Sequence, residues 1–543
     1  MSSISSLGKM VSGLNAAQKG LQVTGQNISN VNTKGYTRQQ LLQHDTGYLT
    51  IGTNAGYAMQ VGLGVSCTEI RQIRDELADK RLRNESSILG YYQNMTSASQ
   101  EIEALFDEPY GDTLSDMIND FWAQTQKLNT APDGVEERLS FIKSAKVLIG
   151  KINDVSNGLS AYQTQVNKQV ESSVSKVNEL ILQIKDYNEM IAKAEINGDN
   201  ANDYRDQRNL LLDELSTYGK VDYYEEADSR LLVKFEGHIV INKKFTNTLE
   251  LKQTEEGSPF NKPIWSDTKT DVYDMTKESN SANGNDTGSL KALLLVRGDN
   301  YVTADTSWDD VALNDNFSVD KSGNSYMIPK YQKLLNDFTN KLVNMVNEAF
   351  DGTGIGFHEG QAGVPVFVLA DVPSDLVKPA ADASEEEWAA YNERYNALLI
   401  PGNIQVNPEL LESGGYNKLG TVSGDPENAG DNTKITEFLA KWEENIEWYQ
   451  NDGKTAPLSK TVNLTNFYSE FVTDMGTDSS LYRIKANEKN TSVLNIENER
   501  QAMGGVSQDE EFANMLKYQY AYNASARMIT MLDGMLDTII NKL

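Results

Sequence analysis

Apolar side chains recur at alternating steps of three and four residues at both ends of this 543-residue chain, and no other feature constrains its fold as strongly. Such spacing is the heptad seam of a helix that packs against another helix. At the N-terminal end, where only Gln18 and Gly25 are not apolar, the seam consists of Ile4, Leu7, Val11, Leu14, Leu21 and Ile28. The first segment is therefore predicted to be an amphipathic helix.

The C-terminal segment repeats this spacing up to its last residue. Ser525 alone departs from apolar character in the series Met515, Tyr518, Tyr522, Ser525, Ile529, Leu532, Leu536, Ile539 and Leu543. Ser507 and Glu510 have the spacing of a helix-capping box, and Gly504-Gly505 precede them as helix breakers. A single amphipathic helix usually packs on its own domain. Two matched seams predict instead that the two ends pack together as a coiled coil.

A pair of helices on its own is expected to be marginally stable. The apolar surface that it buries is offset by the backbone entropy that it loses. Our hypothesis is that the termini become fully ordered when they pack against copies or relatives of the same chain.

Charge separates the N-terminus from the rest of the chain. Residues 1–44 contain no Asp or Glu and carry only three lysines and Arg38, and without these four cations the formal charge of −29 would be −33. Because an acidic surface repels the phosphate backbone, we do not expect nucleic-acid binding. The apolar runs are far shorter than the ~20 residues of a membrane span. Residues 1–30 lack the apolar core of a signal peptide, and one arginine is few for a mitochondrial transit peptide.

The chain offers few residues for catalysis or metal binding. Its single cysteine, Cys67, excludes an intrachain disulfide framework and a thiolate zinc site. Of its three histidines, His358 has no second histidine at the spacing of a zinc-binding helix. Residues 199–203 resemble part of a calcium loop without its central glycine and final glutamate, and the acidic run 385–387 is typical of a solvated helix face. We therefore expect no enzyme activity, no cofactor and no metal.

Between its ends the chain alternates between helical and β-strand patterns. Three- and four-residue apolar steps predict one helix of about 90 Å from Val135 to about Ile196. Alternation predicts a small antiparallel β-unit at about residues 218–275, and strand signals recur within residues 351–425. The predicted fold class is mainly α with β inserts, a multidomain α+β chain with paired terminal helices, a long helical bundle and a small β-rich outer domain.

These patterns predict three domains. Residues 1–40 and 505–543 would form a terminal coiled-coil domain. Residues 41–350 and 426–504 would form a helical-bundle domain that carries the β-unit, and residues 351–425 would form a β-rich insert.

Three segments carry motifs that occur together in one group of proteins. Residues 21–39, LQVTGQNISNVNTKGYTRQ, contain an N-I-S-N element followed by a T-x-G-Y ending. Residues 202–216 read NDYRDQRNLLLDELS, and residues 505–543 form a long C-terminal seam. In their sequence and order, the three resemble the bacterial flagellar axial proteins, the rod, hook and hook-associated family. The GYTRQ ending and the second segment most resemble the member that joins the hook to the filament.

This resemblance implies a structural protein whose terminal helices form the inner layer of a helical tube, with the β-rich insert facing outward. The motif residues that would end the first helix and turn the chain are Asn27, Ile28, Ser29, Asn30, Gly35 and Tyr36. The residues that would form the assembly interface are Leu7, Val11, Leu14, Leu21, Ile28, Met515, Tyr522, Ile529, Leu532, Leu536, Ile539 and Leu543.

The resemblance also implies partners and a location. The chain would be exported unfolded by the flagellar type III apparatus and would be part of the extracellular flagellum at the hook–filament junction. Its partners would be copies of itself, the hook protein and hook-associated protein 3, and an export chaperone would bind its C-terminal helix.

The sequence leaves alternatives open. Within the family the chain could be the hook protein, hook-associated protein 3 or a filament protein. Outside the family, residues 351–425 could form an adhesin-like binding module or a catalytic insertion, although they show no catalytic motif.

Overall fold

The structure, a computed structural model, describes residues 2–54, 57–106, 113–198, 200–277, 286–313, 325–350, 363–380, 382–423, 430–448 and 461–542. His358, Leu543 and the first residue of the segment 199–203 lie outside these ranges. The described part is mainly α with small β inserts, which confirms the predicted fold class.

The chain forms two compact units. Unit one comprises Met1–Leu89, Ser175–Leu249 and Glu488–Leu543, and unit two comprises Gly90–Val174 and Glu250–Asn487. Three of the four boundaries fall inside long helices, α2 (Glu76–Phe106), α4 (Val135–Ala194) and α12 (Leu464–Gly504). The fourth falls in strand β8 (Leu249–Gln253), directly after Leu249. The division into three domains stays a prediction.

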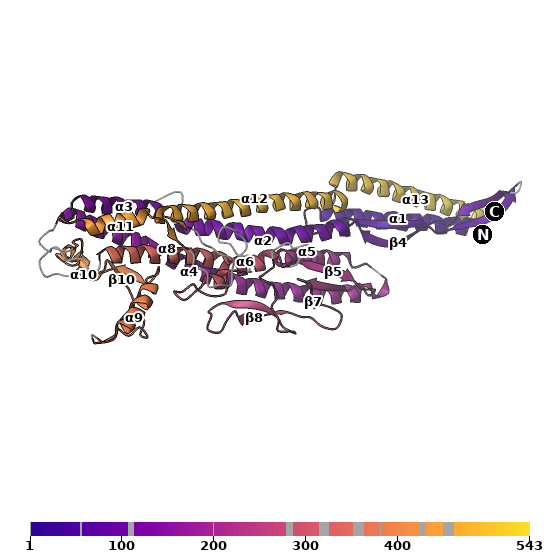
Figure 1. Ribbon diagram of the computed structural model, residues 1–543. Helices are drawn as coiled ribbons and strands as arrows, with labels where there is room; N and C mark the ends of the chain where they lie inside the picture. The colour runs from indigo at the N-terminus through magenta and orange to yellow at the C-terminus, as the bar shows by residue number, and fades with distance from the viewer. Residues whose placement is uncertain are drawn as a thin grey trace. The chain divides into compact units, whose positions relative to one another are not determined.

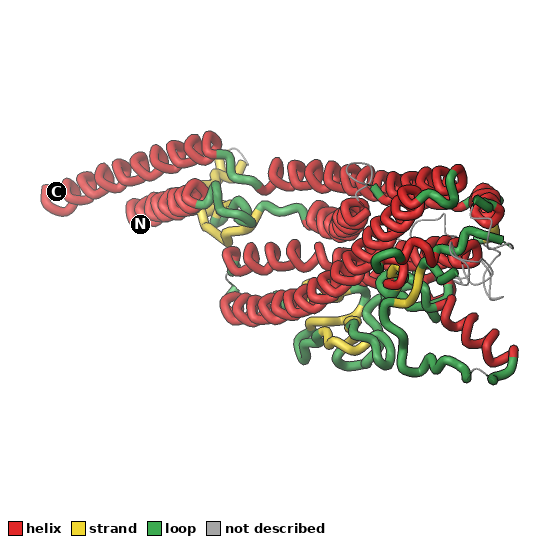
Figure 2. Tube along the Cα trace, turned by 90° about the vertical axis from the view of Figure 1, so that its left-hand side faces the viewer, coloured by secondary structure: helices red, strands yellow, loops and turns green. Residues whose placement is uncertain are grey.

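Unit one begins and ends with two helices that lie side by side, α1 (Ser2–Ser29) and α13 (Gln508–Lys542) (Figures 1 and 2). Gly13 of α1 faces Ser525 and Gly20 faces Tyr518, so the two helices run antiparallel. Helix α13 begins directly after Ser507, whose hydroxyl accepts the Glu510 N–H at 3.5 Å.

A two-stranded ribbon follows α1. Strand β1 (Gln39–Asp45) pairs antiparallel with β4 (Val65–Gln72), and β2 (Tyr48–Asn54) pairs with β3 (Tyr57–Gly62). Backbone bonds from Thr46 N–H to the Gly64 carbonyl and from Leu63 N–H to the Gly47 carbonyl join the two ladders. Gly64, with a positive φ of 119°, brings the ribbon against α1, where Val65 N–H donates to the Ser12 hydroxyl at 3.2 Å.

Helix α5 (Asn202–Tyr218) and a three-stranded sheet complete unit one. The short helix η1 (Glu195–Asn197) leads from α4 toward α5. The sheet has the antiparallel order β5 (Val221–Glu225), β6 (Leu231–Phe235), β7 (His238–Ile241). Asn188 of α4 anchors it, because its amide donates to the Leu231 carbonyl at 2.9 Å and accepts the Leu231 N–H at 3.1 Å. The strands β8 (Leu249–Gln253) and β9 (Asn261–Trp265) pair with each other and, apart from Leu249, belong to unit two.

Unit two is a helical bundle with an aromatic core. Besides parts of α2, α4 and α12, its main helices are α3 (Leu114–Thr130), α6 (Gly288–Arg297), α7 (Trp308–Val311), α8 (Met327–Phe350) and α11 (Thr433–Glu443). The ring of Phe141 lies 5.2 Å from that of Phe121 and 5.0 Å from that of Phe350. Such tilted ring pairs add to the energy of apolar burial.

Residues 363–380 and 382–423 contribute short helices and strands to unit two. Helix α9 (Glu385–Ala397) has no buried residue and extends away from the other helices of the unit (Figure 1). The remaining short elements of unit two are β10 (Phe367–Leu369), β11 (Ile404–Val406), α10 (Pro408–Leu411), η2 (Gly415–Lys418), β12 (Ile446–Glu447) and β13 (Thr461–Val462).

Across the described ranges, no helix has the length and apolar character that a membrane crossing requires. The same ranges bring together no group of three His, Cys, Asp or Glu side chains that could hold a metal ion.

Candidate assembly site

Small side chains let α13 approach α1 closely. A Cβ atom added at Gly20 would lie 2.6 Å from the ring of Tyr518, and one added at Gly13 would lie 3.4 Å from the Ser525 hydroxyl. From Leu7 to the end of α1, the buried residues are small, polar or both, apart from one valine: Ala16, Ala17, Gly20, Val23, Thr24 and Asn27. Because the distance between two helices depends on the side chains at the contact, glycine at these points permits a short separation.

The large apolar seam of α1 is only partly covered within this chain. Leu7, Leu14, Leu21 and Ile28 are half-buried, and Val11 is 39% exposed. Sequence reasoning followed these large residues and missed the small ones that approach α13. The signal was present, because residues 13, 20 and 27 are themselves spaced by one heptad.

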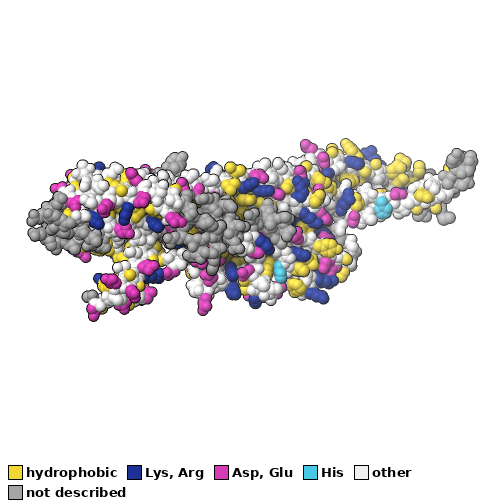
Figure 3. Space-filling model, viewed as in Figure 1, with side chains coloured by type: hydrophobic (Ala, Val, Ile, Leu, Met, Phe, Trp, Pro, Cys, Tyr) yellow, Lys and Arg dark blue, Asp and Glu magenta, His cyan; other side chains and the backbone are white. Residues whose placement is uncertain are grey.

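Helix α13 carries apolar residues on two opposite faces. On the face toward α1, the half-buried members of the predicted seam are Met515, Tyr518, Tyr522, Ser525, Ile529, Leu532 and Leu536. The side chain of Ile539 and all of Leu543 lie outside the described residues. The other face, which we call the open stripe, is 45–71% exposed and consists of Phe512, Leu516, Tyr520, Met528, Met531 and Met535. Apolar side chains are accordingly visible on the surface of this part of the molecule (Figure 3).

The N-I-S-N segment ends α1. The Ser29 hydroxyl donates to the Gly25 carbonyl at 2.8 Å, and the Asn30 amide donates to the Gln26 carbonyl at 3.0 Å. Such local bonds compete with the helical pattern. Gly35, with φ of 83°, then turns the chain toward β1 in a conformation that glycine adopts most readily.

Asn27 is buried and uses both ends of its side-chain amide. Its Nδ2 donates to Glu511 Oε2 at 3.0 Å and to the Gln39 carbonyl at 2.9 Å. Its Oδ1 accepts from the Gln39 N–H at 3.0 Å and from the Tyr36 hydroxyl at 2.8 Å. Burial, with nearby carboxylates, raises the pKa of Tyr36, so this hydroxyl stays protonated. Asn27 therefore links the end of α1, the start of β1 and the first turn of α13.

Arg38 completes the link to α13. Its guanidinium lies 2.8 Å from Glu511 and 3.1 Å from Glu510, while its backbone N–H donates to the Gly504 carbonyl at 2.8 Å. The Glu511 side chain is 2% exposed. Its charge is therefore compensated by Arg38 and Asn27 rather than by water. We call Asn27, Arg38 and Glu511 the terminal clasp.

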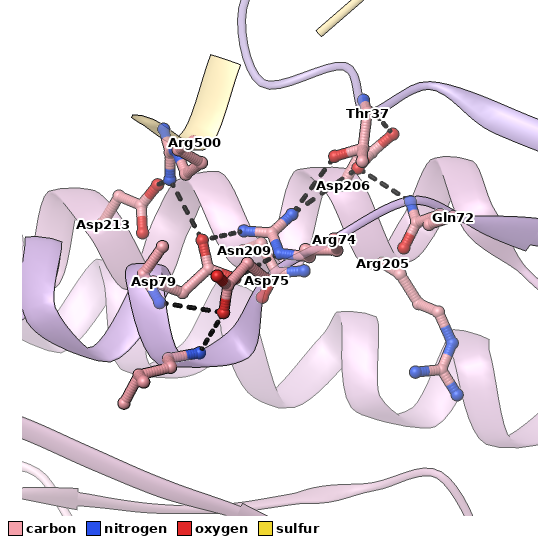
Figure 4. Close-up of polar contacts among 12 residues, drawn as sticks. Thr37, Gln72, Arg74, Asp75, Asp79, Arg205, Asp206, Asn209, Asp213 and Arg500 are labelled. Carbon is pink, nitrogen blue, oxygen red and sulfur yellow. Dashed lines mark hydrogen bonds and ion pairs between the residues drawn. The ribbon is translucent and has the colours of Figure 1, made fainter. Parts of the chain in front are cut away.

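A polar cluster adjoins the terminal clasp (Figure 4). Asp206 of α5 accepts the Thr37 N–H at 3.1 Å and the Gln72 amide at 2.7 Å, and Arg74 lies 3.8 Å away. Burial raises the pKa of Asp206 to about 6, although Thr37 and Arg74 act in the opposite direction. Asp206 thus holds the chain just after the N-I-S-N turn against α5.

Two further carboxylates of this cluster bind guanidinium groups. Asp213 lies 2.7 Å from Arg83 and 2.6 Å from Arg500. Asp79 accepts from Arg74 at 3.1 Å and lies 3.4 Å from Arg500. Burial acts to raise the pKa of Asp213, but Arg83 and Arg500 outweigh it and the pKa is lowered. These charges hold α2, α5 and α12 together beside the terminal helices.

A cleft of about 590 Å³ lies at this place within unit one. It is lined by the turn at residues 30–38, by residues 73–75, by α5 and by the connection from α12 to α13 at residues 497–507. Sequence reasoning quoted residues 202–216 as a motif but gave no role to Asp206 or Asp213. Their seven-residue spacing, which places both on one face of α5, was the available signal.

Comparison with protein families agrees with this geometry. Residues 99–367 match the family described as "Flagellar hook-associated protein FlgK helical domain". Residues 502–543 match "Flagellar basal body rod FlgEFG protein C-terminal", and residues 10–37 match "Flagella basal body rod protein". The last two matches fall on α13 and α1.

Individual relatives span nearly the whole chain. Flagellar hook-associated protein 1 of Bacillus subtilis is 26% identical over 537 residues, which cover 97% of this chain and 96% of that protein. The proteins of the same name from Salmonella typhimurium and Escherichia coli are each 22% identical, with 98% of both chains covered. The structure of the flagellar hook junction protein FlgK from Burkholderia pseudomallei shares the fold, with a TM-score of 0.53 at 11% identity over 78% of this chain and 99% of that chain.

Paired terminal helices, the N-I-S-N turn between α1 and β1 and these matches define a structural protein of the bacterial flagellar axis. Within that class, the chain belongs to the flagellar hook-associated protein 1 family. The resemblance that the three sequence motifs indicated is confirmed.

Proposed function

We propose that this protein is a structural subunit that joins the flagellar hook to the filament and that it assembles through α1 and α13. The observation that carries the proposal is the apolar surface that remains after these two helices have packed together. The open stripe of α13 is 45–71% exposed, and the leucine seam of α1 is half-buried. Contiguous apolar surface of this kind is typical of protein–protein interfaces.

Copies of the same chain are the first partners that this surface fits. In a tube of subunits, the open stripe of one copy would pack against the seam of α1 in a neighbour. The predicted interface residues of both helices would then be buried, partly within a subunit and partly between subunits. The helical bundle would surround this inner layer, and residues 351–425 would face outward.

A protein that joins two parts of the flagellum would have a further partner at each end of its assembly. The hook protein would contact the assembly at one end and hook-associated protein 3 at the other. The protein would leave the cell unfolded through the flagellar export apparatus and act outside the cell, without catalysing a reaction. Before export, a chaperone would cover the apolar faces of α13, which otherwise promote aggregation.

Replacement of Met528 and Met531 by Asp tests the proposal in cells that lack the native gene. We expect the purified variant to keep its helix content, since both side chains are largely exposed, at 45% and 58%. In cells it should give hooks without filaments, and filament protein should appear in the medium.

A control variant separates apolar contact from charge. Asn490→Asp with Asn498→Asp adds the same two charges at exposed polar positions of α12, outside both terminal helices, and should support normal filaments. Wild-type filaments and motility in the Met528→Asp, Met531→Asp strain would refute assembly through the open stripe.

A further inference from the structure

We infer that the terminal clasp, Asn27 with Arg38 and Glu511, sets the register of α13 on α1. A heptad seam repeats every seven residues, so sliding one helix by seven residues preserves most of its apolar pairing. Apolar contacts alone therefore do not define how the two ends of the chain meet. A buried polar contact that can form in one register only is the known way to remove that ambiguity.

Three layers of contact define the observed register. Gly13 meets Ser525, Gly20 meets Tyr518, and Asn27 meets Glu511. Successive layers are seven residues apart on both helices and run in opposite chain directions, as an antiparallel heptad pair requires. The first two layers each contain a glycine, and after a slide this glycine can face a different residue of α13. Only the third contains a buried charge.

Sliding by one heptad in either direction disrupts the third layer. In one direction, Glu511 would face Gly20 and lose the donors that it has in the observed register, at 2.8 Å from Arg38 and 3.0 Å from Asn27. In the other direction, Asn27 would face Tyr518 and lose its carboxylate partner. A charge left buried without its partner is far more costly than a lost apolar contact. The clasp therefore favours one register over its two nearest neighbours.

Register decides which surface the helix pair presents. It sets which residues of the open stripe lie beside which leucines of α1, and thus the pattern that a neighbouring copy meets. This consequence for assembly rests on the proposed function, whereas the register itself is a property of the single chain. The side chains of the clasp residues are largely buried within the chain, so they are not expected to contact a neighbouring copy themselves. They act by positioning α13 on α1.

Disulfide reporters measure the register directly in the purified full-length protein. With Cys67 replaced by Ser, a cysteine at position 13 is combined in turn with one at position 525, 518 or 532. The pair Gly13→Cys with Ser525→Cys reports the observed register, because a Cβ atom added at Gly13 would lie 3.4 Å from the Ser525 hydroxyl. The pairs with Tyr518→Cys and Leu532→Cys report a slide by one heptad in each direction. We expect oxidation to cross-link the 13–525 pair at least about ten times faster than the other two.

Breaking the clasp should redistribute the cross-links. With Glu511→Ala, the 13–525 rate should fall about tenfold and the rate of one slid pair should rise. The charge exchange Arg38→Glu with Glu511→Arg should restore the 13–525 preference. Glu510→Ala is the matched control, because Glu510 also pairs with Arg38 but is 64% exposed, and it should leave all three rates unchanged.

Two outcomes would overturn the inference. A 13–525 preference that survives Glu511→Ala would show that the small residues alone set the register. A fall of all three rates together would show that the clasp only stabilises the pair. The cross-linking rates test only the register, and the filament assay with Met528 and Met531 tests only the proposed function. The two hypotheses can therefore be refuted independently.

Discussion

Helices α4 and α13 have similar apolar spacing, but the main apolar stripe of α4 is buried whereas one whole stripe of α13 is exposed. On α4 the exposed large apolar residues, such as Leu139 and Leu182, lie off that stripe. Along α4 the stripe is fully covered by its own chain, with 0% exposure at Phe141, Leu148, Leu159, Val166 and Ile184. Along α13 the open stripe remains 45–71% exposed. Periodicity therefore identifies a helix with an apolar face but does not show whether that face is covered by the same chain or by another.

The difference follows from the number of elements beside each helix. Side chains along α4 bond to four sequence-distant segments, since Asn153, Gln163, Asn178 and Asn188 donate to the carbonyls of Ile404, Arg297, Leu249 and Leu231. The helix in most extensive contact with α13 is α1. The contact between α1 and α13 uses glycine and alanine, which bury little apolar area and contribute little energy per residue. The large apolar side chains of the open stripe thus stay outside the contact within the chain. A chain that must fold alone would be expected to bury them.

The largest expected effect on stability comes from a substitution in the buried stripe of α4. Phe141→Ala removes a ring with 0% exposure that lies 5.0 Å from the ring of Phe350. We expect the free energy of unfolding of unit two to fall by about 3–5 kcal/mol, as a denaturant titration would show. Phe512→Ala on α13 is the counterpart, at a ring that is 50% exposed. It should change the stability of the free protein by less than about 0.5 kcal/mol, and an equal loss in both variants would remove the distinction.

A second prediction tests the close contact between α1 and α13. Gly20→Leu places a side chain where even a Cβ atom would be 2.6 Å from the Tyr518 ring. Overpacking should cost about 1–3 kcal/mol and should appear as faster amide exchange along both helices. Gly25→Leu is the control, because no atom lies within 4 Å of a Cβ there and the change favours helix formation. Unchanged exchange in the Gly20 variant would mean that the helices are not in close contact.

A third prediction concerns pH and the polar cluster. The pKa of Asp206 is about 6 in the folded protein against an ordinary 3.8, so the folded state binds this proton more tightly. Its contribution to stability is fully present below the lower value and is lost as pH rises through about 6. Between about pH 7.5 and about pH 5, unit one of the wild type should therefore gain about 1 kcal/mol relative to Asp206→Asn. Parallel pH dependence in the two proteins would contradict this assignment.

Much of the fold follows from the sequence. The three-four spacing predicts the terminal helices and the rod from Val135, whose α-helix ends at Ala194 and continues as η1 to Asn197, close to the predicted end at about Ile196. Alternation predicts the β-unit, and three motifs predict the family. These features depend on local periodicity, which a single sequence displays directly.

The contacts that define the site are not local, and the sequence predicts them poorly. Asn27 and Glu511 are 484 residues apart, and nothing in either segment identifies the other as its partner. The contact face of α1 was missed because glycine and alanine carry no hydrophobic signal. The sequence patterns also do not predict the ribbon that contains β1 and β4, since many of its side chains are exposed and, among its apolar side chains that the structure describes, only Leu41 is buried.

The smallest expected effect on the free protein compares two neighbouring residues of α13. Met531 belongs to the open stripe and is 58% exposed, whereas Leu532 lies on the face toward α1 and is half-buried. Met531→Ser should change amide-exchange protection of α13 by less than about 0.5 kcal/mol, because little apolar area is lost from the folded monomer. Leu532→Ser should reduce that protection measurably. In cells lacking the native gene, both variants should impair filament attachment, the first with its helix pair intact and the second with it weakened. An equal loss of amide-exchange protection in Met531→Ser and Leu532→Ser would show that the two faces of α13 do not differ. It would then be wrong to assign one face to the contact with α1 and the other to the contact with a neighbouring copy.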